Sequence, residues 1–313
     1  MDMEMRCGLI ALVGAPNAGK STLINALVGE KVGIVSAKPN TTRITVRGVV
    51  THGSNQLIFM DTPGLNRSEK AFDRRLVQQG QGAGSEADIL VILREIRGRK
   101  AAKGGKDRQR AAESFGLERE MAEQGVARKQ KVVVVLTKID RLADKSALLP
   151  IMTELQGWGV DAVVPVSAVN GATKASGVAQ LLAVLEKMLP EGPWLFPPDQ
   201  VTDMPLPLRL AELTREQAMR LLHQEIPYGV GVLTERIEEV EEGLTLVQQQ
   251  LLVAKEQHKP MVLGNKGQML KEIGTKARKE MQKVMGSGVR LELHVKVADR
   301  WLEREAWLRE MGL

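Results

Sequence analysis

Short apolar runs separated by glycine-rich or polar segments dominate the amino-terminal part of the chain. They occupy residues 9–13, 57–60, 89–93, 132–136 and 162–166. Continuous runs of this length are typical of strands buried on both faces of a parallel sheet. Residues 44–50 alternate instead, which predicts an edge strand, and residues 22–27 and 180–189 show helical spacing. This alternation of strands and helices predicts an α/β domain with a mostly parallel sheet over residues 1–192.

A different pattern follows the proline-rich segment 190–198. The apolar spacing predicts, in order, a helix over 205–222, strands over 228–233 and 244–253, a helix pair around 264–267 and a half-buried strand over 289–297. Residues 238–243 are expected to form an exposed acidic turn, and a last amphipathic helix carries Trp301, Leu302, Trp307 and Leu308. We therefore expect a linker over 193–204 and a second, α+β domain over 205–313.

Composition limits the class of protein. At 313 residues the chain is long enough for two cores, and 43% apolar with 26% charged residues is ordinary for a globular protein. No apolar run has the length of a membrane span, and the polar amino terminus is unlike a secretory signal. Cys7 is the single cysteine, which excludes an internal disulfide, and the four histidines suggest no metal cluster. These features predict a cytoplasmic protein.

The net charge of +6 is unevenly distributed. Residues 255–313 carry 13 Lys/Arg against 8 Asp/Glu, and residues 94–131 carry 12 against 6. Two basic blocks on a nearly neutral body favour an RNA-binding protein. Within the second block, a basic insertion is expected over about 95–130, flexible as far as Arg110 and then helical over 111–127. We interpret it as a tolerated surface insertion, and an arm that contacts nucleic acid is the alternative.

The segment GAPNAGKS fits the phosphate-loop pattern GxxxxGK[ST] and stands between a predicted strand and a predicted helix, as that loop requires. Gly14 and Gly19 lack a Cβ, so their backbone can wrap closely around a phosphate. The Lys20 ammonium can reach the β- and γ-phosphates, and the Ser21 hydroxyl is placed to bind Mg²⁺. An ordinary glycine-rich turn is the alternative. The predicted nucleotide-binding residues here are Gly14, Ala15, Pro16, Asn17, Ala18, Gly19, Lys20, Ser21 and Thr22.

Two further segments are expected beside the phosphates. The run 57–60 ends in DTPG, where Asp61 can hold a water on Mg²⁺ and Gly64 offers its backbone N–H to the γ-phosphate. Of the pair Thr41-Thr42, Thr42 is favoured to complete the metal shell. The predicted metal ligands are therefore Ser21 and Thr42. The predicted catalytic residues are Lys20, Thr42, Asp61 and Gly64, and the loop adds Asp61, Thr62, Pro63, Gly64 and Leu65 to the nucleotide site.

A guanine-reading site is predicted where two later strands end. The segment TKID fits the pattern [NT]KxD, in which Asp140 accepts hydrogen bonds from N1–H and the 2-amino group of guanine. Adenine has no donors at these positions, so the carboxylate selects guanine. The stem of Lys138 can lie over the base, and a backbone N–H at Ser167-Ala168 can meet guanine O6. The predicted base-site residues are Thr137, Lys138, Asp140, Ser167 and Ala168.

The segment GNKG at 264–267 has the GxxG spacing of a KH module. It lies inside the order helix–strand–strand–helix–helix–strand, in which such a loop approaches the phosphates of single-stranded RNA. Only one candidate aromatic residue is near, so base contacts would use hydrogen bonds and aliphatic groups more than stacking. The predicted RNA-binding residues are Gly264, Asn265, Lys266, Gly267 and Lys271.

With these motifs in this order, the chain resembles the Era family of bacterial ribosome-assembly GTPases over nearly its whole length. The resemblance rests on GAPNAGKSTLINAL, KPNTTR, DTPGL, TKID, VSAVNG, PPDQVTD and GNKGQMLKEIGTKAR. It implies a Ras-like P-loop GTPase domain followed by a type II KH domain. It also implies binding of GTP or GDP with Mg²⁺, of K⁺ near Asn17, and of the 3′ region of 16S rRNA in the 30S subunit. A monomer with some inner-membrane association completes this expectation.

The chain departs from the family pattern at three places. Thr137 stands where asparagine is usual, Arg94 and Glu95 with the basic insertion replace the usual strand exit, and GNKG replaces GKGG. Leu65 stands where many GTPases carry a water-positioning glutamine, so slow intrinsic hydrolysis is predicted. The favoured hypothesis is a GTPase switch that controls RNA binding. A non-catalytic RNA-binding scaffold with structural nucleotide, or another P-loop enzyme such as an ATPase or nucleotide kinase, are the alternatives.

Overall fold

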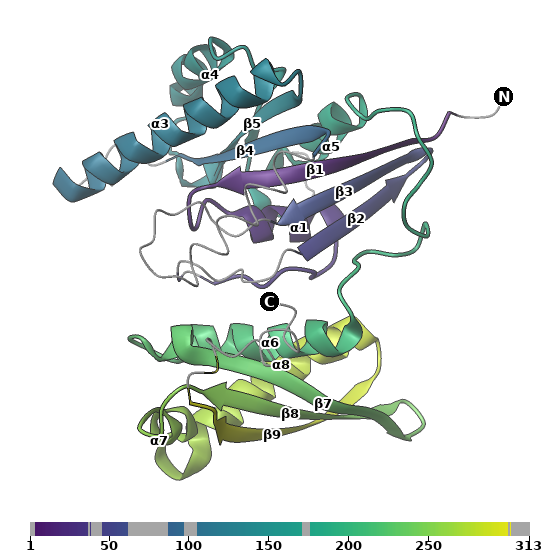
Figure 1. Ribbon diagram of the computed structural model, residues 1–313, viewed down its shortest axis with the longest axis vertical. Coiled ribbons are helices and arrows are strands. Elements are labelled where there is room, and N and C mark those ends of the chain that lie inside the picture. The colour runs from purple at the N-terminus through teal and green to yellow at the C-terminus, as the bar shows by residue number, and fades with distance from the viewer. Residues whose placement is uncertain are drawn as a thin grey trace. The chain divides into compact units, whose positions relative to one another are not determined.

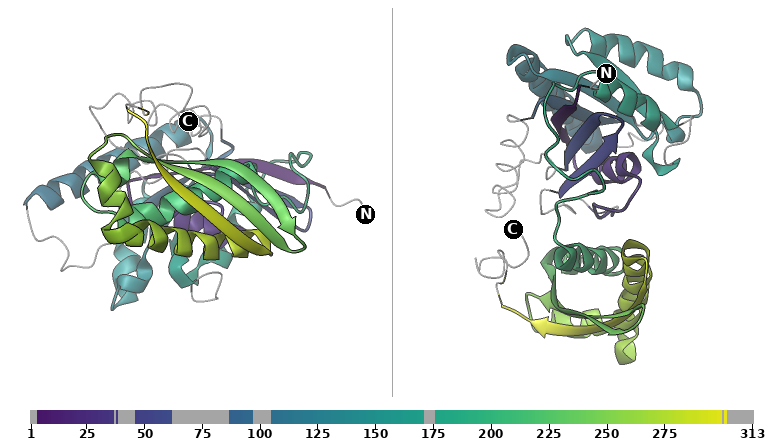
Figure 2. Two further views of the ribbon diagram at one scale, coloured as in Figure 1. Left: turned by 90° about the horizontal axis from the view of Figure 1, so that it is seen from below. Right: turned by 90° about the vertical axis from the view of Figure 1, so that its right-hand side faces the viewer.

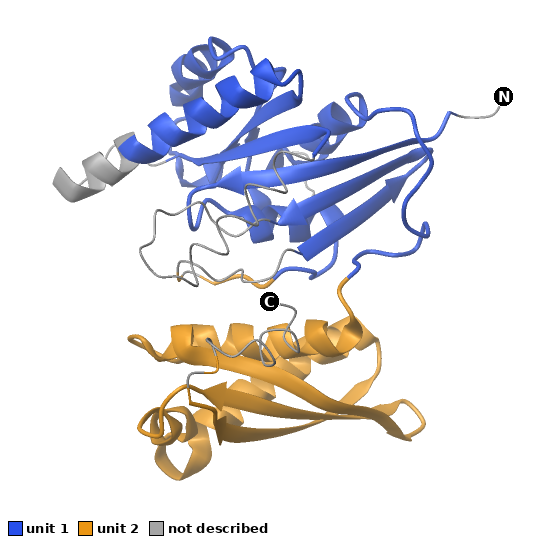
Figure 3. Cartoon of the chain, in the orientation of Figure 1, with its two compact units in different colours: residues 1–33, 45–203 blue, residues 34–44, 204–313 orange. Residues whose placement is uncertain are grey.

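The computed structural model describes residues 4–36, 38, 46–61, 87–96, 105–170, 176–299 and 301, with the backbone alone given for 105–112 and 170. The chain divides into two compact units, one of residues 1–33 and 45–203 and the other of residues 34–44 and 204–313 (Figure 3). Several predicted features lie outside the described residues: Thr42, Thr62, Pro63, Gly64, Leu65 and the helix expected after Trp301.

A six-stranded sheet forms the centre of the first unit (Figure 1). Its strands are β1 (Arg6–Gly14), β2 (Val46–His52), β3 (Asn55–Asp61), β4 (Ile89–Glu95), β5 (Lys131–Thr137) and β6 (Ala162–Val166). They lie in the order β2-β3-β1-β4-β5-β6, and every neighbouring pair is parallel except β2 and β3. The parallel strands therefore end at one edge of the sheet, which brings Gly14, Asp61 and Thr137 to that edge. The predicted mostly parallel sheet with an edge strand is confirmed.

Helices cover both faces of this sheet (Figure 2). The described helices are α1 (Lys20–Val28), α3 (Gly105–Ala127), α4 (Leu148–Gln156) and α5 (Val178–Glu186). Alternate residues of the central strands, such as Leu90 and Val132, share a core with Ala122 of α3 and Leu155 of α4. The intervening strand residues are equally buried. Burial on both faces explains why these strands are continuous apolar runs in the sequence.

The basic insertion is ordered earlier than expected. Backbone hydrogen bonds of α3 begin at Gly105, whereas the sequence predicted a flexible chain as far as Arg110. Lysine, arginine, glutamine and alanine, which fill the first turns, are all good helix formers, so propensity outweighs the polar, low-complexity composition. Packing of Phe115 on Trp158, with ring centroids 5.2 Å apart, anchors the later part of the helix.

The segment expected to be a linker, 193–204, runs along the first unit as far as Asp203. Gln56 of β3 fixes it, because its Oε1 accepts hydrogen bonds from the backbone N–H groups of Leu195 and Phe196 at 2.9 and 3.0 Å. Trp194 Nε1 also donates to a backbone carbonyl of the same hairpin at 3.0 Å. The proline content predicted an irregular segment, but it did not predict that this segment would form hydrogen bonds with the β2–β3 hairpin.

The second unit has a three-stranded sheet. Its elements are α6 (Leu206–Leu221), β7 (Val230–Glu241), β8 (Leu244–Val253), α7 (His258–Leu263), α8 (Gln268–Met285) and β9 (Gly288–Val297). β8 lies between an antiparallel β7 and a parallel β9. Side chains of α6 and α8, including Leu213 and Met281, form cores with alternate strand residues such as Val247 and Leu251. The predicted element order is confirmed.

The expected acidic turn is shorter than the sequence suggested. β7 continues to Glu241, so the turn to β8 is made by Glu242 and by Gly243, which has a φ of 73°. Pairing with β8 holds the acidic residues in strand conformation, although glutamate is a poor strand former. Among the described residues, no helix combines the length and apolar character needed to cross a bilayer.

Candidate functional site

The loop between β1 and α1 has a backbone suited to phosphate. Gly14 and Gly19 have φ angles of 152° and 102°, and Asn17 is left-handed with a φ of 64°. A Cβ on Gly14 would lie 2.6 Å from the carbonyl oxygen of Leu93, so only glycine fits there. α1 begins at Lys20, directly after Gly19. The N–H groups of the loop and of the first helical turn therefore form an anion-binding site.

Lys20 supplies a buried positive charge to this loop. Its side chain donates hydrogen bonds to the carbonyls of Gly14 and Ala15 at 3.0 and 3.2 Å, and the residue is only 7% exposed. Burial lowers the pKa of the Lys20 ammonium, while the nearby Asp61 carboxylate acts in the opposite direction. A buried ammonium beside anion-binding amides is placed to compensate the charge of a polyphosphate.

Ser21, one of the two predicted metal ligands, contacts Asp61, which was predicted to hold a water on the metal. The Ser21 hydroxyl donates to Asp61 Oδ2 at 2.6 Å, and Asp61 is buried. A Cβ on Gly33 would lie 3.2 Å from the Ser21 Cβ and 3.7 Å from Asp61 Oδ2, so the chain passes closely over this pair. A hydroxyl and a carboxylate at this spacing are the hard oxygen donors that Mg²⁺ prefers, and the residues present fit that ion.

Asn25 is a structural support beside the predicted metal site that the sequence analysis missed. Its Oδ1 accepts hydrogen bonds from the backbone N–H groups of Val32 and Gly33, and its Nδ2 donates to the Gly33 carbonyl, all within 2.9 Å. These bonds fix the start of the connector that leads to Thr42. An asparagine within the apolar run 23–28 of α1 is the available signal, because asparagine has a low helix propensity.

The base-reading segment is tied directly to the phosphate loop. The Thr137 hydroxyl donates to the carbonyl of Ala18 at 2.7 Å, and Lys138 Nζ donates to the carbonyl of Asn17 at 2.7 Å. Thr137, which stands where the family usually has asparagine, therefore ties the base-reading segment to the phosphate loop. Lys138 has a left-handed backbone, with a φ of 61°. Two hydrogen bonds thus set the distance between the predicted base and phosphate sites.

Asp140 is oriented by the last strand of the sheet. Its Oδ1 accepts a hydrogen bond from the hydroxyl of Ser167 at 2.7 Å, while the Asp140 side chain stays exposed. Ser167 is itself buried, and its N–H donates to the carbonyl of Ser176 at 2.7 Å. Ala168, half-buried, follows it. The predicted base-site residues from the ends of β5 and β6 therefore lie together, and the Ser167 hydroxyl orients the Asp140 carboxylate.

In the second unit, the GNKG segment forms a tight turn between α7 and α8. Gly264 has φ 70° and ψ −175°, and a Cβ there would lie 2.7 Å from the Cβ of Met269. Lys266 and Gly267 are left-handed, with φ angles of 49° and 78°. The side chains of Asn265 and Lys266 are exposed at the end of α8. The turn therefore presents backbone and a cation outward, as phosphate binding requires.

Lys271, the remaining predicted RNA contact, lies one helical turn into α8 and is exposed. Two other lysines of this helix are ion-paired within it: Lys276 with Glu272 and Lys283 with Glu280, each at 2.7 Å. Lys276 and Lys283 are therefore partly neutralised by neighbouring glutamates of the same helix.

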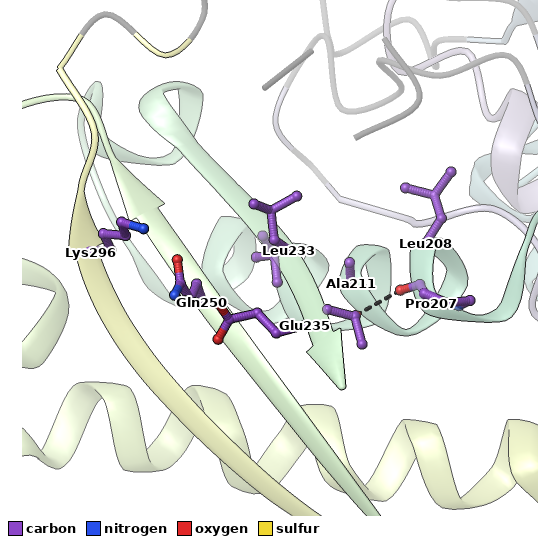
Figure 4. Close-up of a pocket in the computed structure, with 9 residues that line it drawn as sticks. Pro207, Leu208, Ala211, Leu233, Glu235, Gln250 and Lys296 are labelled. Carbon is purple, nitrogen blue, oxygen red and sulfur yellow. Dashed lines mark hydrogen bonds between the residues drawn. The ribbon is translucent and has the colours of Figure 1, made fainter. Parts of the chain in front are cut away.

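A separate cavity of about 310 Å³ lies between α6 and β7 (Figure 4). Pro207, Leu208 and Ala211 line one side, and Leu233 and Glu235 line the other. Of the predicted nucleotide- and RNA-binding residues that the structure describes, none lines it. It is distinct from both predicted sites.

The chain matches two family models. A model described as 50S ribosome-binding GTPase matches residues 9–138, and a model described as KH domain matches residues 225–302. GTPase Era of Desulfovibrio desulfuricans is 40% identical over 314 residues, which covers 100% of this chain and 98% of that protein. GTPase Era of Dinoroseobacter shibae is 42% identical and covers 98% and 95% of the two proteins.

Two solved structures are similar over both units. Era of Aquifex aeolicus bound to GDP and AlF4⁻ has a TM-score of 0.83 and 34% identity, and the match covers 98% of this chain and 99% of that one. Era in complex with MgGDPNP and nucleotides 1506–1542 of 16S ribosomal RNA has a TM-score of 0.82, with the same identity and coverage. The predicted Ras-like GTPase fold with a carboxy-terminal KH domain is thereby confirmed.

Proposed function

This chain belongs to the Era family of GTPases, which hydrolyse GTP, and from that premise we propose that it is a nucleotide-controlled assembly factor of the small ribosomal subunit. Family membership makes it a GTP-hydrolysing enzyme with a site for guanine nucleotides. This excludes the non-catalytic scaffold and the other P-loop enzymes, such as an ATPase or a nucleotide kinase. The proposal adds two points. The second unit binds ribosomal RNA, and the nucleotide bound in the first unit changes the affinity for that RNA.

For the nucleotide half, the described residues support a division of roles. The loop amides and Lys20 hold the phosphates, and Asp140 reads guanine. Ser21 would bind Mg²⁺ and Asp61 would hold one of its waters; the ion, when bound, neutralises charge on the β- and γ-phosphates. Thr42 and Gly64 are proposed to complete this site. K⁺ beside Asn17 remains a proposal that rests on the family resemblance.

For the RNA half, one observation carries the proposal: the GNKG turn exposes a left-handed Lys266 next to the amino terminus of α8, with Lys271 one turn beyond. Such a turn suits the phosphates of single-stranded RNA. The similar Era structure holds nucleotides 1506–1542 of 16S ribosomal RNA. We infer that this chain binds the 3′ region of 16S rRNA in the 30S subunit as a cytoplasmic monomer, with some of it at the inner membrane.

Control by nucleotide is supported by the connector before Thr42. Residues 34–44 group with the second compact unit. The Lys38 ammonium donates hydrogen bonds to the backbone carbonyls of Met219 and Leu222, where α6 ends. A movement of Thr42 on GTP binding or hydrolysis would act on this segment. We infer that the nucleotide changes RNA affinity through it.

The RNA-binding half is tested with a labelled oligonucleotide of the 16S rRNA 3′ end. We expect Lys266→Glu with Lys271→Glu to weaken binding at least tenfold. The slope of the logarithm of affinity against the logarithm of salt concentration should fall by the equivalent of about two phosphate contacts. Lys276→Glu with Lys283→Glu is the matched control, because it reverses the same number of charges at lysines that are already ion-paired with Glu272 and Glu280. Equal losses in both variants would mean that general charge, and not the GNKG turn, determines binding.

A further inference from the structure

A carboxylate outside the predicted nucleotide site lies against its base-reading segment. Glu95 is the last residue of β4, and its Oε1 lies 2.9 Å from Lys138 Nζ and 3.1 Å from Arg141 Nη1. The exposed fractions of the Glu95 and Lys138 side chains are 17% and 20%. This ion pair is therefore largely shielded from solvent, and salt screens it less than a surface pair.

Lys138 is held from two sides. Its ammonium has three N–H donors, and two of them have acceptors in the first unit: the Asn17 carbonyl at 2.7 Å and the Glu95 carboxylate at 2.9 Å. A lysine side chain has several rotatable bonds, so one acceptor alone would leave it mobile. The carboxylate and the carbonyl together define one position for the ammonium, between β4 and the phosphate loop.

The end of β4 is a firm support for this carboxylate. Arg94, the preceding residue, binds α3: its Nη1 lies 3.1 Å from Glu118 Oε2, and its guanidinium carbon lies 4.2 Å from the ring centroid of Phe115. The Arg94 carbonyl lies 3.4 Å from the Thr137 hydroxyl. Backbone pairing of Glu95 with Thr137 in the parallel ladder completes the attachment.

We propose that Glu95 is a positioning residue of the guanine-nucleotide site. Its carboxylate holds the Lys138 ammonium on the Asn17 carbonyl, and so keeps the Lys138 stem in place for the base and the phosphate loop in register with the TKID segment. Arg141 shares the carboxylate but is mostly exposed, and the positioning does not depend on it. The proposal deepens the nucleotide half of the proposed function and is independent of RNA binding.

The test is the release rate of a fluorescent ribose-labelled GDP from the full chain, measured by stopped flow. Glu95→Gln keeps the shape of the side chain and removes its charge, and we expect release to become roughly 3- to 10-fold faster. Glu186→Gln is the matched control, because its side chain is also 17% exposed and pairs with His52 at 2.7 Å in the same unit. It should release GDP at the wild-type rate, and so should Arg141→Gln.

A second background separates positioning from general destabilisation. In Lys138→Met, which already lacks the ammonium, adding Glu95→Gln should leave the release rate unchanged, and the melting temperature of Glu95→Gln alone should match that of Glu186→Gln. A Glu95→Gln release rate equal to wild type would overturn the proposal. So would an equal acceleration in the Lys138→Met background, since Glu95 would then act through another group. RNA affinity enters none of these measurements.

Discussion

Replacing Thr137 by valine removes one hydroxyl from the contact between the base-reading segment and the phosphate loop. Valine has nearly the same shape, so no cavity forms. Thr137 is 4% exposed and Ala18 is 1% exposed, and the hydroxyl donates to the Ala18 carbonyl at 2.7 Å. Because that carbonyl would lose a donor that water cannot replace, we expect a loss of about 1–3 kcal/mol. The loss is shared between the free energy of unfolding and the affinity for GDP.

Two assays divide that loss. Urea unfolding of the nucleotide-free protein gives the stability share, and equilibrium titration with a fluorescent GDP gives the affinity share. Thr153→Val is the matched control, because the Thr153 hydroxyl donates to the Leu149 carbonyl at 3.1 Å on an exposed helix turn. That variant should stay within about 0.5 kcal/mol of wild type in both assays. If Thr137→Val behaved like Thr153→Val, the hydroxyl would not join the two halves of the site, and the reasoning would fail.

Two further predictions concern single residues. Gly264→Ala should lower the free energy of unfolding by about 2–4 kcal/mol, because the backbone conformation there suits glycine alone and the new methyl would meet Met269. Gly267→Ala, which has open space around it, should lower the free energy of unfolding by about 1 kcal/mol. Urea unfolding of the two variants compares these values. Lys20→Met should abolish GDP binding in the same titration. Because burial lowers the pKa of Lys20, the unfolded chain binds more protons from that lowered pKa up to 10.5. Wild type should therefore gain stability relative to Lys20→Met as pH rises through this window, and a pH-independent difference in urea unfolding would contradict this.

Much of the first unit could be predicted from the sequence because its strands are buried on both faces. Residues 132–135 are four consecutive valines, which favour a strand over a helix, and the polar motifs follow directly where such strands end. Parallel strands end at one edge of a sheet, so the order of motifs along the chain already predicted that Ser21, Asp61 and Asp140 share one site. In the first unit, the chemistry of the motifs and the order of the parallel strands therefore led to the same predicted site.

Long-range side-chain contacts could not be predicted in this way. Gln56 and Asn25 each form hydrogen bonds with several backbone N–H and carbonyl groups of another segment. The type of a polar residue does not indicate which backbone groups it will bind. The sequence marked Glu95 only as part of an altered strand exit, and nothing in it indicated that this carboxylate pairs with Lys138. The predicted start of α3 was wrong for a related reason. Glycine and lysine content indicates disorder, whereas helix propensity and packing favour an ordered helix.

The measurement that tests the central claim most directly is the affinity of one protein sample for the 16S rRNA 3′-end oligonucleotide, determined with saturating MgGDP and again with saturating MgGDPNP. A site that controls RNA binding predicts affinities that differ by about tenfold or more, with the tighter binding in GDPNP. Equal affinities in the two nucleotides, at the same salt concentration, would show that the guanine site and the KH domain act independently, and would contradict the account.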